Sequence, residues 1–374
     1  MFVGKEEKKV EFIELIYDLI FVYIIGRNNS ILHNITGGVV SLDSFLAYVV
    51  STLAIIQIWN FTTFYINRYG KNRVRDYILL FVNMYLLYYI AEGTRSSWHD
   101  YLPQYCIAWG LILINIGIHY IIEYKEHLGA PWETVQIKRN VFILFGEAVL
   151  VFACIPMFQY TKISLVGIPI LFGIIATIIS SNVNKLVVVD FAHLTERAML
   201  YVVLTFGEMI IVIASYFEGK NDINTIYFSV MAFLIVVGMF LSYGKVYNDI
   251  IDKNLSTNGT GYMMMHVFLI FALNNITTSL EFMRDEKVDL LFKVEFLAAS
   301  MVLYYVFLFL TERYAKERLK PCKSMIISVI ILTVGFVAVM ILFRTYMYVN
   351  IAATVIFAFG IYGLIHKFGK AIND

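Results

Sequence analysis

Residues 11–29 read EFIELIYDLIFVYIIGRNN, an apolar stretch that carries three acids and an arginine. Glu11, Glu14 and Asp18 are spaced i, i+3 and i+7, so an α-helix places all three on one face. Most other positions are large and apolar, which suits lipid or packed helices. An acid inside a bilayer costs roughly 2.5 kcal/mol or more unless it is paired, neutralised or in contact with water. We therefore predict a membrane-spanning helix whose acidic face points toward partners or a cavity.

The composition extends this prediction to the whole chain. Its 374 residues are 60% hydrophobic and 15% charged, whereas soluble domains are about 45–50% apolar and about 25% charged. Runs of about 20 apolar residues, the length that spans a bilayer, occur twelve times, at 11–33, 44–66, 77–95, 101–123, 140–158, 162–183, 195–217, 223–245, 260–281, 289–311, 324–343 and 347–366. We predict an all-α polytopic bundle of about twelve spans, with a single transmembrane domain over 1–374.

The distribution of basic residues predicts the orientation of these spans. Most of the 29 Lys and Arg residues fall in the N-terminus and in alternate loops, and such a bias marks the cytoplasmic side. Both termini are then cytoplasmic, and no cleavable signal is recognisable at the start. The first and seventh spans each carry a glutamate near the inner end, which suggests parallel repeats over 1–185 and 186–374. A net charge of +1 gives no reason to expect nucleic acid as a partner.

Further charged residues lie inside the other spans. Glu147 and Glu208 each follow Phe-Gly in an apolar setting, and the span that contains Glu208 opens with DFAHLTER, residues 190–197. On a helix, Arg197 and Glu208 share one face, which forms a polar seam from the inner end to the midplane. Intramembrane acids are functional candidates by default, although a structural network of ion pairs explains the same residues. The candidates for a substrate or proton pathway are Glu14, Asp18, Arg27, Glu147, His193, Glu196, Arg197 and Glu208.

Histidines suggest an alternative, metal-based chemistry. His119, His193 and His266 fall near the cytoplasmic ends of their spans, at a depth similar to that of several carboxylates. Histidines and carboxylates from several helices can together hold a divalent ion. However, no local metal-binding motif occurs, and equal depth is not proximity. We predict no cofactor, and these three histidines are weak candidates for metal ligands.

Two stretches resemble the bacterial low-temperature-requirement A (LtrA) family of integral membrane proteins. ELIYDLIFV at 14–22 is similar to the family's E-L-F-x-D-L-x-F-V opening, and HLTER at 193–197 with FGE at 206–208 is similar to its H-x-x-E-R…L-G-E segment. Phe206 stands where leucine is usual, and Ile16-Tyr17 replaces an aromatic pair. The resemblance implies a multi-pass protein of the bacterial cytoplasmic membrane. The family name describes a growth phenotype and implies no chemistry.

Three functions remain open at this point. The leading hypothesis is a transporter of a small solute, coupled to protons through the intramembrane carboxylates. The second is a membrane-embedded enzyme, metal-dependent or not, that acts on a lipid or isoprenoid, so catalytic activity is the less favoured alternative. The third is an ion channel or a membrane sensor. No feature of the sequence names the substrate, and a homo-oligomer is compatible with all three.

Overall fold

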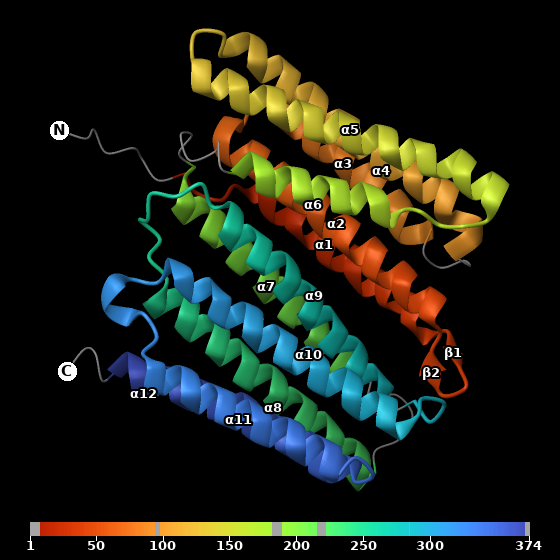
Figure 1. Cartoon of the computed structure of the whole chain (residues 1–374), viewed down its shortest axis with the longest axis vertical. Coiled ribbons are helices and arrows are strands. Elements are labelled where there is room, and N and C mark those ends of the chain that lie inside the picture. The colour runs from red at the N-terminus through yellow and green to blue at the C-terminus, as the bar shows by residue number, and fades with distance from the viewer. Residues whose placement is uncertain (1–7, 94–97, 182–188, 215–221, 284, 371–374) are drawn as a thin grey trace. The chain divides into compact units, whose positions relative to one another are not determined.

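The computed structural model describes residues 8–93, 98–181, 189–214, 222–283 and 285–370, and these are almost entirely α-helical (Figure 1). They contain twelve α-helices, eleven of which are long and apolar enough to cross a membrane. The exception is α6, whose 15 residues span Gly167–Ser181 and which precedes a segment outside the described residues. The predicted all-α polytopic bundle is confirmed, with α6 shorter than the expected span at 162–183.

The chain divides into two compact units. The first contains α1 (Phe12–Asn28), the 3₁₀ turn η1 (Asn29–His33), α2 (Leu42–Tyr69), α3 (Val74–Gly93), α4 (Trp98–Glu126), α5 (Pro131–Thr161), α6, the part of α7 (Phe191–Ala214) up to Tyr201, and the part of α9 (Thr260–Phe282) up to Val267. The second contains the strands β1 (Ile35–Thr36) and β2 (Val39–Val40), the rest of α7 and α9, α8 (Ile223–Lys245), the π-helical turn η4 (Val246–Ile250), α10 (Leu290–Leu310), the 3₁₀ turns η5 (Thr311–Tyr314) and η6 (Glu317–Leu319), α11 (Lys323–Leu342) and α12 (Met347–Lys370).

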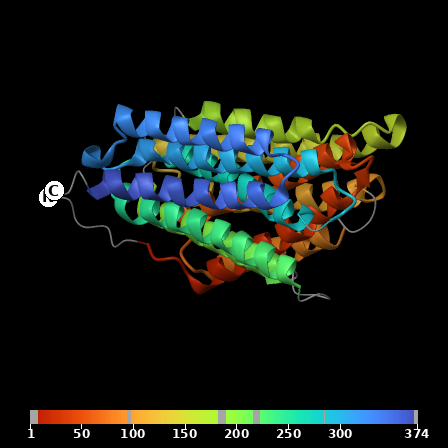
Figure 2. The same cartoon turned by 90° about the horizontal axis from the view of Figure 1, so that it is seen from below.

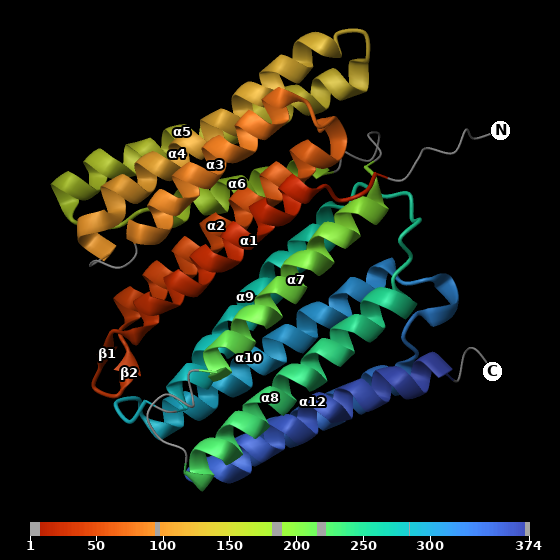
Figure 3. The same cartoon turned by 180° about the vertical axis from the view of Figure 1, so that it is seen from behind.

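Glycines allow the long helices of the first unit to pack closely. In α4, Gly110 faces the ring of Phe152 and Gly117 faces the ring of Phe145, both from α5. A Cβ atom at either glycine would overlap the phenylalanine ring, which is why small residues are favoured at helix contacts in membranes. Figure 3 shows α4 and α5 lying side by side along their lengths, next to α3. In this unit α3 also contacts α1, and α4 also contacts α2.

The second unit is built in the same way. Gly238 of α8 packs against Ala358 of α12, where an added Cβ would lie 2.9 Å from the alanine Cβ. The Tyr304 hydroxyl of α10 donates a hydrogen bond of 3.0 Å to the carbonyl of Met239 in α8. Figures 1 and 2 show α8 and α12 running side by side. The β1–β2 hairpin pairs Thr36 with Val39 in antiparallel register, and its turn uses two glycines with positive φ.

Candidate functional site

A buried ion cluster joins α1 to the start of α7 in the first unit. Arg197 binds Asp18 through two hydrogen bonds, from Nε to Oδ2 at 2.9 Å and from Nη2 to Oδ1 at 2.5 Å. Its remaining terminal nitrogen, Nη1, pairs with Oε2 of Glu14. Arg197 and Asp18 are completely buried, and Glu14 is 1% exposed. The planar guanidinium suits this arrangement because its fork of donors can bind one carboxylate in bidentate fashion and reach a second.

His193 extends the cluster by one turn toward the start of α7. Its Nε2 lies 3.3 Å from Oε2 of Glu14, and its Nδ1 lies 3.0 Å from the amide nitrogen of Asn67 in α2. An amide nitrogen is a donor only, so Nδ1 acts as the acceptor and the ring proton sits on Nε2, facing Glu14. This tautomer is assigned from the hydrogen-bond pattern. Nε2 thus faces the Glu14 carboxylate at ion-pair distance, but it makes no hydrogen bond of regular geometry with it.

Asn67 locks the end of α2 onto the start of α7. Its amide nitrogen donates 2.8 Å to the Asp190 carbonyl, and the Asp190 backbone N–H donates 3.1 Å to its amide oxygen. The Asp190 side chain in turn accepts from the His193 backbone N–H at 3.0 Å, as an N-cap residue does. It also accepts from the Lys8 backbone N–H at 2.9 Å. The segment before α1 and the ends of α2 and α7 are thus held together around His193.

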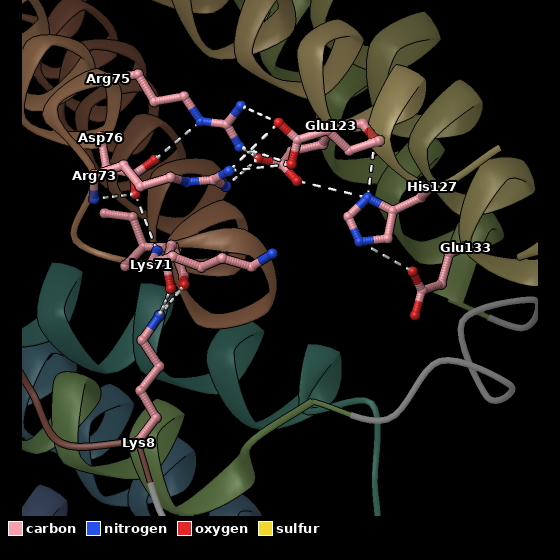
Figure 4. Close-up of polar contacts among 11 residues, drawn as sticks. Lys8, Lys71, Arg73, Arg75, Asp76, Glu123, His127 and Glu133 are labelled. Carbon is pink, nitrogen blue, oxygen red and sulfur yellow. Dashed lines mark hydrogen bonds and ion pairs between the residues drawn. The ribbon is translucent and has the colours of Figure 1, made fainter. Parts of the chain in front are cut away.

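Lys8, which precedes α1, also binds the end of α2 through its side-chain ammonium. It binds the carbonyl of Ile66, which also accepts from the Gly70 backbone N–H, and, at 2.9 Å, the carbonyl of Gly70 just after the end of α2. Figure 4 shows the side chain reaching this helix end. Burial lowers the pKa of the Lys8 ammonium, and the negative charge of Glu14 acts in the opposite direction.

Aromatic side chains enclose the ion cluster. Trp59 of α2 donates from Nε1 to Oδ1 of Asp18 at 2.8 Å, and its ring packs against Tyr201 at a centroid distance of 4.7 Å. Tyr17 shares a hydrogen bond of 3.0 Å with Thr62 and also packs on Phe21. Trp59, Tyr201, Tyr17 and Phe21 are all fully buried. The charges therefore face one another in an environment with little solvent, where electrostatic interactions are strong.

The charge of the cluster does not balance. Glu14 and Asp18 contribute two negative charges and Arg197 one positive charge, so the set carries one excess negative charge when His193 is neutral. Lys8 and Asp190 add one charge of each sign and leave this excess unchanged. A proton bound within the cluster would neutralise it. Because uncompensated charge inside a bilayer is costly, the number of protons bound here affects how strongly α1 and α7 hold each other.

The other predicted acids lie apart from this cluster. Glu147 of α5 is fully buried and accepts from the Gln57 amide at 3.2 Å, against the backbone of Gly173 in α6. No cation among the described residues pairs with Glu147. Glu196 is half-buried and makes no hydrogen bond or ion pair within the described parts of the chain. Thus Arg197, and not its neighbour Glu196, contacts the acids of α1.

Glu208 and Arg27 also have separate surroundings. Glu208 belongs to the second unit, is half-buried, and interacts electrostatically with Glu281 of α9. Arg27 lies near the end of α1, with its guanidinium carbon 5.8 Å from the ring centroid of Tyr23. The two charged residues of the polar seam expected along α7 therefore have different partners. Arg197 belongs to the ion cluster, and Glu208 interacts with Glu281. The pathway role of both residues stays a prediction.

The three candidate histidines are not gathered around one point. His266 donates from Nδ1 to the carbonyl of Tyr262 within α9 at 2.9 Å, and His119 packs edge-on against Tyr65. Among the described residues, no group of three or more His, Cys, Asp and Glu side chains is arranged to hold a metal ion. Metal binding by these histidines stays a prediction of the sequence alone.

A second ionic cluster, which the sequence did not suggest, lies at the α2–α3 connection (Figure 4). Glu123 of α4 is fully buried and accepts from Arg75 and, at 2.9 Å, from Arg73. Both arginines also bind Glu126, one turn further along α4. His127 lies 3.6 Å from the second Glu123 oxygen. The available signal was Arg73 just before α3, Arg75 in its first turn, and two glutamates spaced i, i+3 on α4, but the sequence alone does not show that these residues pair.

Comparison with known proteins identifies the family. A search of curated proteins and a search of solved structures return no match. The model of the bacterial low temperature requirement A protein (LtrA) family matches residues 9–360, which include both helices of the ion cluster. This range covers almost the whole chain, and its helices are those of a multi-pass membrane protein. The chain therefore belongs to the bacterial LtrA family.

Proposed function

We propose that this protein is a proton-coupled transporter of a small solute, with the ion cluster of Glu14, Asp18, His193 and Arg197 as the site where the driving proton binds. The observation that carries the proposal is a buried site that brings together two acids, one arginine and one histidine, so that its net charge depends on the protons it holds. A purely structural ion network gains most when its charges cancel. A site with one excess negative charge can instead alternate between a charged and a neutral state.

The proposed mechanism uses the position of the cluster between two helices. Glu14 and Asp18 lie on α1, and His193 and Arg197 lie on α7. With a proton bound, the cluster is neutral and both helices can move through the low-dielectric interior at small cost. Without the proton, the excess charge favours the conformation that exposes the cluster to water. Coupling then arises because the substrate and the proton each favour one of two arrangements, as in alternating access.

Two features support His193 and Glu14 as the exchanging pair. Nε2 of His193 lies 3.3 Å from Glu14, and Glu14 stands one turn into α1, closer to the helix start than Asp18. Asp18 accepts two hydrogen bonds from Arg197 and one from Trp59, so three of the about four acceptor positions of its carboxylate are occupied. In this proposal Asp18 and Arg197 form the fixed ion pair, and Glu14 and His193 form the less tightly bound part of the cluster.

Proteoliposomes with a trapped pH-sensitive dye test the proposal. A potassium diffusion potential or a pH gradient is imposed, candidate solutes are added, and internal pH is followed for wild type, Glu14→Gln and Asp18→Asn. The matched control is Glu317→Gln, an exposed glutamate in η6 whose side chain is 85% accessible. We expect solute-dependent proton movement in wild type and in the control, and loss of it in both cluster variants at equal protein levels. Equal movement in all four proteins would refute the assignment of the cluster as the proton site.

A further inference from the structure

A partly enclosed cavity lies within the first unit. It is formed where the end of α2, the start of α5, the ends of α4 and α6 and the start of α9 come together, and the space in it that is open to the centre of a water-sized molecule is about 30 Å³. Polar residues on its wall are Arg68, Gln136, Asn140, Thr177 and Ser180. Aromatic and aliphatic residues line the remainder. The cavity therefore combines a cation with several hydrogen-bonding groups in a largely apolar surround.

Several donors on this wall have no partner among the described residues. The Nε and Nη2 atoms of Arg68, both atoms of the Gln136 amide, and the Ser180 hydroxyl are buried and make no hydrogen bond. Gln136 is only 1% exposed and Ser180 only 6%. An unsatisfied buried polar group destabilises a fold, and more so when it is charged. Three neighbouring side chains with this defect indicate a site that is completed by something else.

The charge of Arg68 is also uncompensated within the described parts of the chain. Its guanidinium carbon lies 5.6 Å from the ring centroid of Phe64, but it forms no ion pair with a carboxylate. Glu133 is the acid that influences it electrostatically, and that side chain is 41% exposed and 3.5 Å from Nε2 of His127. By contrast, Arg73, Arg75 and Arg197 all bind buried carboxylates. Arg68 thus differs from these three arginines in having no carboxylate bound to it.

We propose that this cavity is a binding site for a small oxyanion, a carboxylate or phosphate group, with Arg68 as its principal ligand. A guanidinium binds such groups through paired N–H donors, and an anion would also accept from the Gln136 amide and the Ser180 hydroxyl. The aromatic walls around these donors remove competing water, which strengthens the interaction. The inference is independent of proton transport, because it rests on residues outside the ion cluster.

The position of the site connects it to the helix ends described above. Arg68 directly follows Asn67, whose amide nitrogen donates hydrogen bonds to the Asp190 carbonyl and to Nδ1 of His193. An anion bound at Arg68 therefore lies against the same turn of α2 that holds the start of α7. The bound group can be a free anion or the head of a larger molecule such as an anionic lipid, and both present the same oxygens.

Binding is tested on the full-length protein, purified in an uncharged detergent and phosphate-free buffer. Inorganic phosphate, sulfate and acetate are titrated at constant ionic strength against chloride, with thermal unfolding and calorimetric titration as readouts. Arg68→Gln is compared with Arg344→Gln, which removes the same charge from an exposed position in the second unit. We expect wild type and Arg344→Gln to bind at least one oxyanion, and Arg68→Gln to bind it about 10- to 100-fold more weakly, as the loss of a charge-assisted hydrogen bond predicts.

Nanodiscs distinguish the two sources of the oxyanion. Discs of phosphatidylcholine alone are compared with discs that contain phosphatidylglycerol. A melting temperature raised by phosphatidylglycerol in wild type, and not in Arg68→Gln, assigns a lipid headgroup, whereas a response to free anions in both kinds of disc assigns a soluble ligand. The proposal is overturned if no oxyanion and no anionic lipid stabilises wild type more than chloride does, or if Arg68→Gln and Arg344→Gln respond alike.

A second variant covers the case in which Arg68→Gln does not fold. Gln136→Leu replaces the unsatisfied amide with an apolar side chain of similar length. Without ligand, we expect this variant to melt at or above the wild-type temperature, since a buried unpaired amide has been removed. Its oxyanion affinity should fall by about 10-fold, as one hydrogen bond to a charged group is lost. Unchanged affinity in Gln136→Leu would exclude the cavity as the binding site.

Discussion

Replacing Arg197 with glutamine tests whether the ion cluster holds α1 against α7. The substitution removes the single cation and leaves the buried carboxylates of Glu14 and Asp18 without a counter-charge. Removing one partner of a buried ion pair costs about 3–5 kcal/mol, because the remaining charge stays buried and unpaired. For a chain of this length that unfolds cooperatively, the loss corresponds to a melting temperature lower by roughly 4–6 °C.

Asp18→Asn should cost less than Arg197→Gln, about 1–3 kcal/mol. Glu14 and Arg197 then balance each other, and the asparagine oxygen can still accept from Trp59. The double variant should be more stable than Arg197→Gln alone, since it leaves only one buried carboxylate. Heating the detergent-solubilised proteins and following tryptophan fluorescence gives the order of stability, with Arg344→Gln as the control. The reasoning is refuted if Arg197→Gln melts like wild type, or if the two losses simply add in the double variant.

Two further predictions concern the surroundings of the buried acids. Gly173→Ala should destabilise the protein by about 1–3 kcal/mol, because its Cβ would overlap both the Gln57 amide and the Glu147 carboxylate, which are hydrogen-bonded to each other and buried. Gly207→Ala, with nothing within 4 Å of the added Cβ, should not, and equal melting temperatures would contradict this packing. Trp59→Phe keeps an aromatic ring and removes the N–H that binds Asp18. We expect the free energy of unfolding to fall by about 1.5–3 kcal/mol. A variant as stable as wild type would show that this hydrogen bond contributes nothing.

The sequence predicts the fold class and part of the ion cluster for the same physical reason. Charges inside a bilayer need partners, so an acid stripe in one span and an arginine in another indicate each other as partners from the amino-acid sequence alone. Glu14, Asp18, His193 and Arg197 were thus among the eight candidates, but the sequence did not separate them from Arg27, Glu147, Glu196 and Glu208. Apolar runs of the right length likewise predicted the helices, because a bilayer leaves the backbone few alternatives to a helix.

The remaining contacts depend on the order in which helices pack, which hydrophobic periodicity does not specify. In the sequence, Asn67 is an ordinary polar residue near the end of a span. Its hydrogen bonds to Asp190 and His193 follow only from the contact between α2 and α7. Glu147 looked equivalent to Glu208 because both follow Phe-Gly. In the structure, however, Glu147 is hydrogen-bonded to Gln57, whereas Glu208 interacts electrostatically with Glu281. The cavity at Arg68 is formed by several helices that are distant in sequence, so no local pattern reveals it.

The most direct test of the central claim is the charge that moves when a proton enters the cluster. Proteoliposomes adsorbed on a solid-supported membrane are given a rapid pH step, and the transient current is recorded without added solute. We predict a current in wild type and in Glu317→Gln, and its loss in Glu14→Gln and Asp18→Asn. A current of the same size in the two cluster variants, or none in wild type, would contradict proton binding at this site.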